Sequence, residues 1–132
     1  MHKVVVDTNV FISGIVFGGN PRKIILLWLT KKYQCCISPE LKAEILGKLK
    51  NKFLLSKENL QEIEEALDAL SVKFVPKIKL EICQDPTDNF LLELSEESNA
   101  DFLISDDKKV LDLKRHKSTK IISPKEFLDT FE

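Results

Sequence analysis

The chain has 132 residues, of which 43% are hydrophobic and 31% are charged, and its formal net charge at pH 7 is −1. These values are typical of a globular protein that buries a core. The near-neutral charge excludes a generic polyanion binder, so any affinity for nucleic acid must come from a local basic patch. Three cysteines, an odd number, argue against a disulfide framework and indicate a reducing cytoplasm. No apolar run approaches the ~20 residues that a membrane-spanning helix requires, so no membrane association is expected.

Strands and helices are predicted to alternate along the whole chain, from apolar runs, helical periodicity and turn residues. In the first half, the predicted elements are a strand at 3–7, helices at 10–16 and 21–32, a strand at 33–37, and helices at 39–50 and 57–70. In the second half, they are a strand at 72–75, a helix at 86–98, a strand at 101–105, a helical turn at 109–113, a strand at 120–122 and a helix at 124–131. This order predicts βαβ units and a parallel sheet covered on both faces, in a single domain over residues 1–132.

Four Xaa-Pro steps mark predicted helix starts, because proline favours the first helical position. In each step, the residue before proline can cap the free amides of the helix. The four steps are Asn20-Pro21, Ser38-Pro39, Asp85-Pro86 and Ser123-Pro124. Glu126 adds the acid of a capping box to the last of them.

Two of the predicted strands end in acidic residues, although they lie far apart in the sequence. The run 3–6 leads into Asp7, and the run 102–105 leads into Asp106 and Asp107. The carboxyl ends of neighbouring parallel strands meet at one edge of a sheet, where open α/β folds bind their ligands. Carboxylates gathered there repel one another unless a cation lies between them. The pattern therefore predicts a divalent-metal site, and carboxylate ligands favour Mg²⁺ or Mn²⁺.

Each acid also has a simpler structural interpretation. Asp7 can cap the next helix, although Thr8 and Asn9 add a hydroxyl and an amide at the same strand end. Asp85 and Asp88 open a helix, where negative charge interacts favourably with the helix dipole. Asp88 nevertheless shares its helix face with apolar residues, which is an unusual place for a solubilising charge. Glu44 lies at the edge of an apolar helix stripe, and its spacing alone does not select it.

Taken in order, these motifs resemble those of the PIN-domain ribonucleases. The quoted motifs are Asp7-Thr8-Asn9, Glu44, Asp85-Pro86-Thr87-Asp88-Asn89 and Ser105-Asp106-Asp107. The chain resembles the branch that forms toxin components of toxin–antitoxin systems, over nearly its whole length. The resemblance implies a three-layer α/β/α fold with a five-stranded parallel sheet. It also implies an acidic pocket that binds Mg²⁺ or Mn²⁺ at the strand ends.

The resemblance assigns roles to individual residues. It implies that the catalytic and metal-binding acids are Asp7, Glu44, Asp88 and Asp107. It implies supporting roles for Thr8, Asn9, Ser105 and Asp85. Asp106 stands where the branch has glycine, so it is either an extra ligand or an exposed charge. Because side chains alternate along a strand, only one of two adjacent acids can face the pocket while the strand geometry persists, and the resemblance favours Asp107.

The implied activity is hydrolysis of RNA phosphodiesters by water activated at the metal, in a cytoplasmic endoribonuclease. RNA is the implied substrate, an antitoxin protein is a possible partner, and a homodimer is a possible assembly. One alternative is a PIN-like module that binds RNA or a partner protein without cleaving. Another is an aspartyl-phosphate enzyme or a receiver-like domain. A phosphatase of that kind requires Asp-x-Asp after the first strand, where this chain has Asp7-Thr8-Asn9. A receiver usually has paired acids near the first strand and a lysine after the last, and the sequence shows neither pattern clearly.

Overall fold

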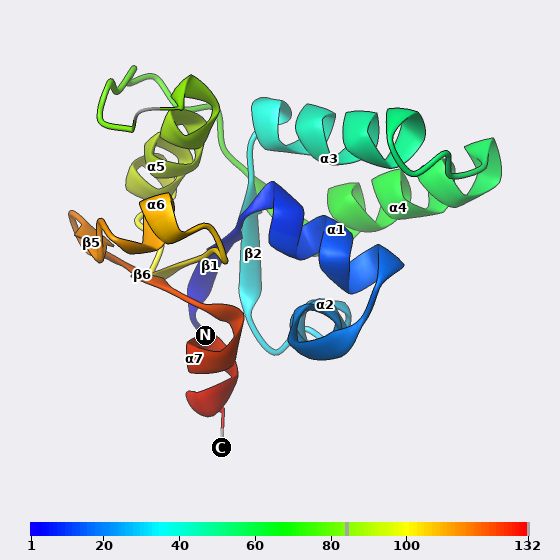
Figure 1. Cartoon of the computed structure of the whole chain (residues 1–132), viewed down its shortest axis with the longest axis horizontal. Coiled ribbons are helices and arrows are strands. Elements are labelled where there is room, and N and C mark those ends of the chain that lie inside the picture. Colours follow the sequence, from blue (N-terminus) through cyan, green and yellow to red (C-terminus); the bar gives the residue numbers. More distant parts are fainter. Residues whose placement is uncertain (84, 132) are drawn as a thin grey trace.

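The computed structural model describes residues 1–83 and 85–131. Within these residues, a six-stranded sheet forms the centre of the molecule, with the strand order β3-β2-β1-β4-β6-β5 (Figure 1). The strands are β1 (Lys3–Val6), β2 (Gln34–Ile37), β3 (Ser71–Lys73), β4 (Phe102–Ile104), β5 (Arg115–His116) and β6 (Thr119–Ile122). The first five strands in the sheet order pair in parallel, which confirms the predicted α/β class.

The sheet was predicted to have five strands, and the described residues form six. β5 is a short strand that pairs antiparallel with β6, as Arg115 lies opposite Lys120 and His116 opposite Thr119. The chain reverses between them at Lys117, whose φ of 53° lies in the left-handed region. β5 contains no apolar run, and apolar runs are the pattern from which the strands were predicted. The sequence therefore contains no indication of β5.

The helices are α1 (Thr8–Val16), α2 (Gly19–Leu29), α3 (Pro39–Asn51), α4 (Lys57–Leu70), α5 (Pro86–Ser98), α6 (Lys108–Leu111) and α7 (Pro124–Asp129). Ser38 caps α3 and Ser123 caps α7 with a complete capping box, as predicted. The predicted cap at Asn20 is wrong. α2 begins at Gly19, and its cap is Gly18, whose φ of 119° favours glycine over any other residue.

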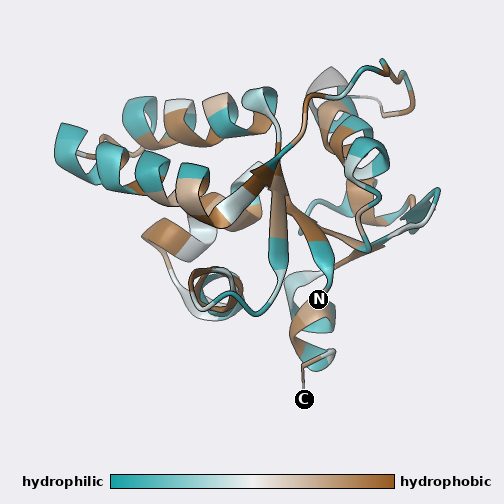
Figure 2. Cartoon of the chain, turned by 180° about the vertical axis from the view of Figure 1, so that it is seen from behind, coloured by the Kyte–Doolittle hydropathy of each residue, from teal (hydrophilic) through white to brown (hydrophobic). Residues whose placement is uncertain are grey.

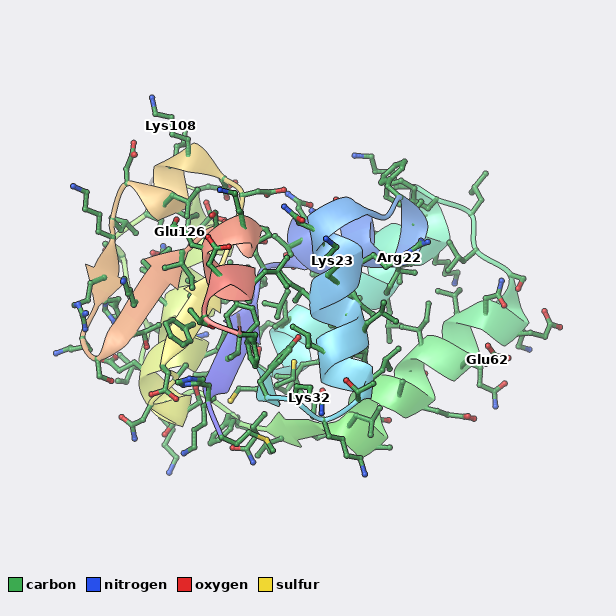
Figure 3. All side chains as sticks on the ribbon, turned by 90° about the horizontal axis from the view of Figure 1, so that it is seen from below. Arg22, Lys23, Lys32, Glu62, Lys108 and Glu126 are labelled. Atoms are coloured by element: carbon green, nitrogen blue, oxygen red, sulfur yellow. The ribbon has the colours of Figure 1, made fainter. Side chains whose placement is uncertain are left out.

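Helices cover the sheet on both faces. Viewed from below, α2 and α5 lie on opposite sides of β1 (Figure 3), and α7 packs against α2. Figure 2 shows apolar colour along the central strands and polar colour on much of α3 and α4. The core is continuous from the sheet into α5, because Val4 to Val6 and the leucines 91, 92 and 94 are all almost fully buried. Strands buried on both faces explain why β1 is an uninterrupted apolar run.

Helix α1 carries the first strand-end motif, so its placement matters for the site. α1 packs closely on α2 at Gly14, where an added Cβ would lie 2.6 Å from the Pro21 carbonyl oxygen and would overlap Ile25. Arg22 donates hydrogen bonds to the Gly14 and Ile15 carbonyl oxygens, at 3.0 and 3.1 Å, near the end of α1. Among the described residues, no single helix has the length and apolar character needed to cross a membrane, and the α1–α2 pair, which meets the criterion in combination, is bent by 95°.

Candidate metal centre

The carboxyl ends of β1 and β4 bring the first two motifs together. Val6 lies opposite Ile104 in the parallel register, and the Asp7 amide donates to the Ile104 carbonyl oxygen at 2.9 Å. Asp7 is 6% exposed and caps α1, since its Oδ1 accepts a hydrogen bond from the Asn9 amide. Capping and site formation are therefore compatible roles of one carboxylate, and the simpler interpretation of Asp7 does not exclude the functional one.

A buried hydroxyl joins the two strand ends. Ser105 is fully buried, and its Oγ donates to Asp7 Oδ2 at 2.7 Å. The same Oγ accepts from the Asp107 amide at 3.1 Å, and Asp107 Oδ1 then accepts from the Lys109 amide as the cap of α6. Ser105 thus fixes Asp7 and turns the chain from the sheet into α6.

The expected alternation between Asp106 and Asp107 rests on a premise that the structure contradicts. The strand was predicted to reach Ser105, but β4 ends at Ile104 and residues 105–107 belong to neither a strand nor a helix. Asp106 is exposed and Asp107 is half-buried. Nevertheless, the charge of Asp106 contributes to raising the pKa of Asp7, and that of Asp107 contributes to raising the pKa of Asp88. Both acids therefore lie within electrostatic reach of the site.

Asp88 enters the site from the first turn of α5, on the side where that helix begins. Its side chain is half-buried, and a pocket of about 240 Å³ lies beside it. The pocket is lined by Ile82, Cys83, Asp85, Asp88, Lys109, Val110, Asp112 and Leu113. Asp85 precedes the helix, and its carbonyl oxygen accepts a hydrogen bond from the Asp88 amide at 3.0 Å.

The segment 77–83, called the strap here, leads into this pocket and is bonded along one edge of α5. Asn89 is buried, and its Oδ1 accepts from the Ile82 and Cys83 amides at 3.1 and 2.8 Å. One helical turn later, the buried Glu93 accepts from the Leu80 amide at 2.8 Å. Glu97 accepts from the Lys77 amide at 3.3 Å. Three side chains spaced four residues apart therefore hold an extended backbone against the helix.

Glu44 approaches from α3, and a lysine accompanies it. Lys48 Nζ lies 3.3 Å from Glu44 Oε1, one helical turn along α3, and 3.3 Å from Asn9 Oδ1. Glu44 is half-buried, whereas Asn9 is exposed. Lys48 thus links α3 to the beginning of α1 at the edge of the acidic cluster.

The acids influence one another electrostatically. Burial is the main cause that raises the pKa of Asp7 from 3.8 to about 6, while the Ser105 hydrogen bond acts in the opposite direction. Burial also raises the pKa of Asp88, and the charges of Asp85 and Asp107 add to this effect. Glu44 raises the pKa of Asp88 further, and Lys109 lowers it. Crowded carboxylates with raised pKa values are the electrostatic pattern that a bound cation would relieve.

Comparison with known proteins places this arrangement in a family. The sequence model of the family described as "PIN domain" matches residues 3–109. The chain belongs to the PIN-domain family. It is also 32% identical to the uncharacterized protein MJ1680 of Methanocaldococcus jannaschii, over 98% of this chain and 92% of that protein. PIN domains have a nuclease-like fold, and the carboxyl-end site described above is where a ligand of such a sheet is expected.

The donor chemistry of this PIN domain fits a hard divalent cation. Four carboxylates from α3, α5 and the two strand ends supply oxygen, the ligand atom that Mg²⁺ and Mn²⁺ prefer. Thr8 adds a buried hydroxyl, since its Oγ1 has no hydrogen-bond partner among the described residues. In the part of the chain that the structure describes, however, no three Asp, Glu, His or Cys side chains converge closely enough to hold an ion. The acids lie near the carboxyl ends of β1 and β4, and their side chains would have to move closer to one another to coordinate a cation.

Sequence patterns did not identify Lys48, Cys83 or the strap as parts of this region. The i, i+4 spacing of Glu44 and Lys48 is a signal that could have found the lysine. Cys83 lies beside the acids, two residues before Asp85, and burial together with the charges of Asp88 and Asp85 raises its pKa. Nothing in the sequence of the strap indicates that α5 side chains bind its backbone.

Proposed function

We propose that this chain is a Mg²⁺- or Mn²⁺-dependent endoribonuclease that hydrolyses RNA phosphodiesters. The observation that carries the proposal is the buried 2.7 Å hydrogen bond between Ser105 and Asp7. It joins the ends of β1 and β4 at the position where the PIN-family acids gather, with Asp88 within electrostatic reach of Asp7. The remaining acidic motifs also follow one another along the chain in the order expected for the family, which supports the proposal.

The chain's own residues have separable roles in this proposal. Asp7, Glu44, Asp88 and Asp107 would hold the cation, and Thr8, Asn9 and Ser105 would orient them, with Asp85 and Asp106 at the periphery. When bound, the cation would supply Lewis-acid activation of water and neutralise charge at the phosphodiester. Lys48 and Lys109 flank the acids and would pair with the phosphates of the substrate. Since the attacking group in this proposal is water, the carboxylates hold the metal and none of them needs to act as a covalent nucleophile.

The biological setting is part of the same proposal. By family likeness, we infer the toxin component of a toxin–antitoxin pair, acting in the cytoplasm as one domain over residues 1–132. An antitoxin protein would be its inhibitor, and a homodimer its assembly. The free cysteines Cys35 and Cys36 are buried in the core, as expected for small apolar side chains in a reducing compartment.

The test is cleavage of a mixture of labelled single-stranded and hairpin RNAs with Mn²⁺, Mg²⁺ or EDTA. Products are expected only with a divalent metal. Asp88→Asn is expected to reduce the rate by at least about 100-fold, since a ligand is removed. Full activity in EDTA, or unchanged activity in Asp88→Asn, would contradict the proposal.

A second candidate is a PIN-like module that binds RNA or a partner protein without cleaving it. One observation favours it, namely that the acids of the described residues do not converge on a single point. Calorimetry with Mn²⁺ separates the two candidates. The nuclease is expected to bind metal in a manner that an Asp7/Asp88/Asp107 triple Asn variant loses, whereas a non-catalytic module would give the same signal in both proteins.

A further inference from the structure

An exposed aromatic side chain lies at the far end of α1, away from the acids. Phe17 is 72% exposed, which is unusual for a phenylalanine, because burying such a ring is strongly favourable. Its ring meets that of Phe53 edge to face, with a centroid distance of 5.7 Å and an interplanar angle of 78°. Lys52 Nζ lies 5.8 Å from the centroid of the Phe53 ring. We call Phe17, Lys52 and Phe53 the aromatic edge.

The aromatic edge is connected to the acidic cluster by two helices that run side by side. Lys48 of α3 contacts Asn9 at the beginning of α1, and Phe53, just after α3, contacts Phe17, just after α1. The two contacts bracket α1, whose 9 residues span about 13 Å. α1 and α3 also pack against each other directly. A strand of nucleic acid cleaved at the acids could therefore reach the aromatic edge within a few nucleotides.

The geometry of the aromatic edge is fixed by the backbone. α3 ends in a tight turn in which the Leu55 amide donates to the Leu49 carbonyl oxygen at 3.1 Å. Leu54 adopts a φ of 53° in that turn, a left-handed conformation that is uncommon outside glycine. The turn places Phe53 against Phe17. Since Lys52 lies over the Phe53 ring, Phe17 is the ring with an open face.

The charges around the aromatic edge favour a polyanion. Lys48 and Lys52 lie along the path from the acids, and Arg22 is anchored at the end of α1 by its bonds to the Gly14 and Ile15 carbonyl oxygens. A pocket beside the aromatic edge is lined by Val16 and Leu55, and Glu62 is the acidic residue among its lining side chains. An exposed ring with lysines beside it is the arrangement on which single-stranded nucleic acids stack their bases. An apolar protein partner would not need the cations.

From these observations, we propose that Phe17 stacks on a base of single-stranded RNA a few nucleotides from the bond that is cut, while Lys52 and Lys48 contact the phosphates between. This inference deepens the proposed function and rests on it for the identity of the substrate. The aromatic edge would set how much single-stranded RNA the enzyme requires beside its cleavage point. It would not read sequence strongly, because every base offers a π face.

Binding of a labelled ten-nucleotide single-stranded RNA, followed by fluorescence anisotropy in EDTA and low salt, tests the proposal without cleavage. Phe17→Ala is expected to weaken binding by at least about fivefold, and Phe17→Trp to retain it. Lys52→Gln is expected to reduce the slope of log Kd against log salt by about 0.7. Leu29→Ala is a matched control, since Leu29 is also an exposed apolar residue at the end of a helix, and it should bind as the wild type does.

An abasic site moved along the same RNA identifies the stacked base. At one position, loss of the base should weaken binding to the wild type by the factor seen for Phe17→Ala. In the Phe17→Ala variant, the same abasic site should then have no further effect. Far-UV circular dichroism of the variant, which changes only an exposed ring, should match that of the wild type.

Three results would overturn the proposal: no binding of the RNA by the wild type, equal binding by the wild type and Phe17→Ala, or full binding by Phe17→Leu. The last result would mean that the surface needs only an apolar side chain, as an interface with a protein or a second copy would. These results are distinct from failure of the proposed function. If binding depends on Phe17 but no metal gives cleavage, the nuclease assignment fails and the stacking site stands.

Discussion

The strand half of the acidic site, Asp7 and Ser105, differs from its helix half, Asp85 and Asp88, in how it is held. Asp7 is buried at the junction of two hydrogen-bonded strands, and Ser105 fixes its carboxylate. Asp88 is half-buried, and the loop before it is attached to α5 through the strap. One half is therefore positioned by the sheet itself, whereas the other depends on a few bonds between side chains and backbone. Such bonds open locally at lower free energy than a buried sheet does.

The largest expected effect is at Asp7. Asp7→Asn should abolish metal-dependent cleavage and also stabilise the metal-free protein at high pH. The folded protein holds a proton on Asp7 up to pH of about 6, whereas the unfolded chain loses it near 3.8. Stability of the wild type in EDTA should therefore fall as the pH rises from about 4 to about 6, by up to about 3 kcal/mol. Asp7→Asn should lack this decrease.

Urea unfolding in EDTA at several pH values measures the effect. Asp88→Asn is the matched control in the helix half, where the half-exposed carboxyl should give a smaller change in the same direction. Equal pH dependence in the wild type and Asp7→Asn would show that the two halves are not distinguished by burial.

The next effect is at the strap. Asn89→Ala leaves the Ile82 and Cys83 amides without their shared acceptor, and it is expected to destabilise the fold by about 1–3 kcal/mol. Amide hydrogen exchange should accelerate in the strap before it does in β1 or β4. Asn89→Asp keeps the oxygen acceptor and should restore protection. Unchanged exchange in Asn89→Ala would mean that packing, not these bonds, holds the strap.

Replacing Ser105 is expected to have a smaller effect, on the pH dependence of metal affinity, because Ser105 hydrogen-bonds to Asp7. A metal requires the ionised carboxylate, so Mn²⁺ affinity should rise with pH and level off above about 6. Ser105→Ala removes the hydrogen bond that lowers the pKa of Asp7, and the rise in affinity should move to higher pH by about one unit. Calorimetric titrations across pH measure the shift. Ser95→Ala removes a buried serine hydroxyl within α5 and should leave the midpoint in place.

The smallest effect is expected at Asp106. It is exposed and stands outside the set that the PIN resemblance selects, so Asp106→Asn should change cleavage by no more than about twofold. Asp107→Asn should nearly abolish cleavage, since a proposed ligand is lost. Cleavage rates of the two variants, measured side by side, decide which of the two acids is the ligand. A larger defect in Asp106→Asn would mean that the acid of the strand half is misassigned by one residue.

The parts of the fold that the sequence predicted are those with repeated apolar signals. Uninterrupted runs such as Val4 to Val6 and Leu103 to Ile104 are buried on both faces, and the helices between them carry apolar stripes. The parts it did not predict depend on single backbone conformations. β5 exists because of a turn at Lys117, and α2 begins at Gly19 because Gly18 adopts a positive φ.

The candidate site divides in the same way. Asp7, Asp106 and Asp107 could be found because each follows an apolar strand, and the parallel topology then brings the strand ends together. Glu44 and the strap could not, because their positions depend on how α3 and α5 pack in three dimensions. The alternation rule failed at Asp106 and Asp107 because it holds only within a strand, and β4 ends at Ile104.

Trp28 gives the molecule an intrinsic optical reporter. It is the one tryptophan in the sequence and is almost fully buried in α2. Its indole Nε1 donates to the Leu70 carbonyl oxygen at 3.0 Å, and its ring meets that of Phe11 in α1 at 5.1 Å. One fluorophore therefore contacts both the helix that Asp7 caps and the end of α4. Its emission wavelength should report whether α1, α2 and α4 remain docked in the variants described above, with no attached dye; Phe17→Trp is the exception, because it adds a second tryptophan.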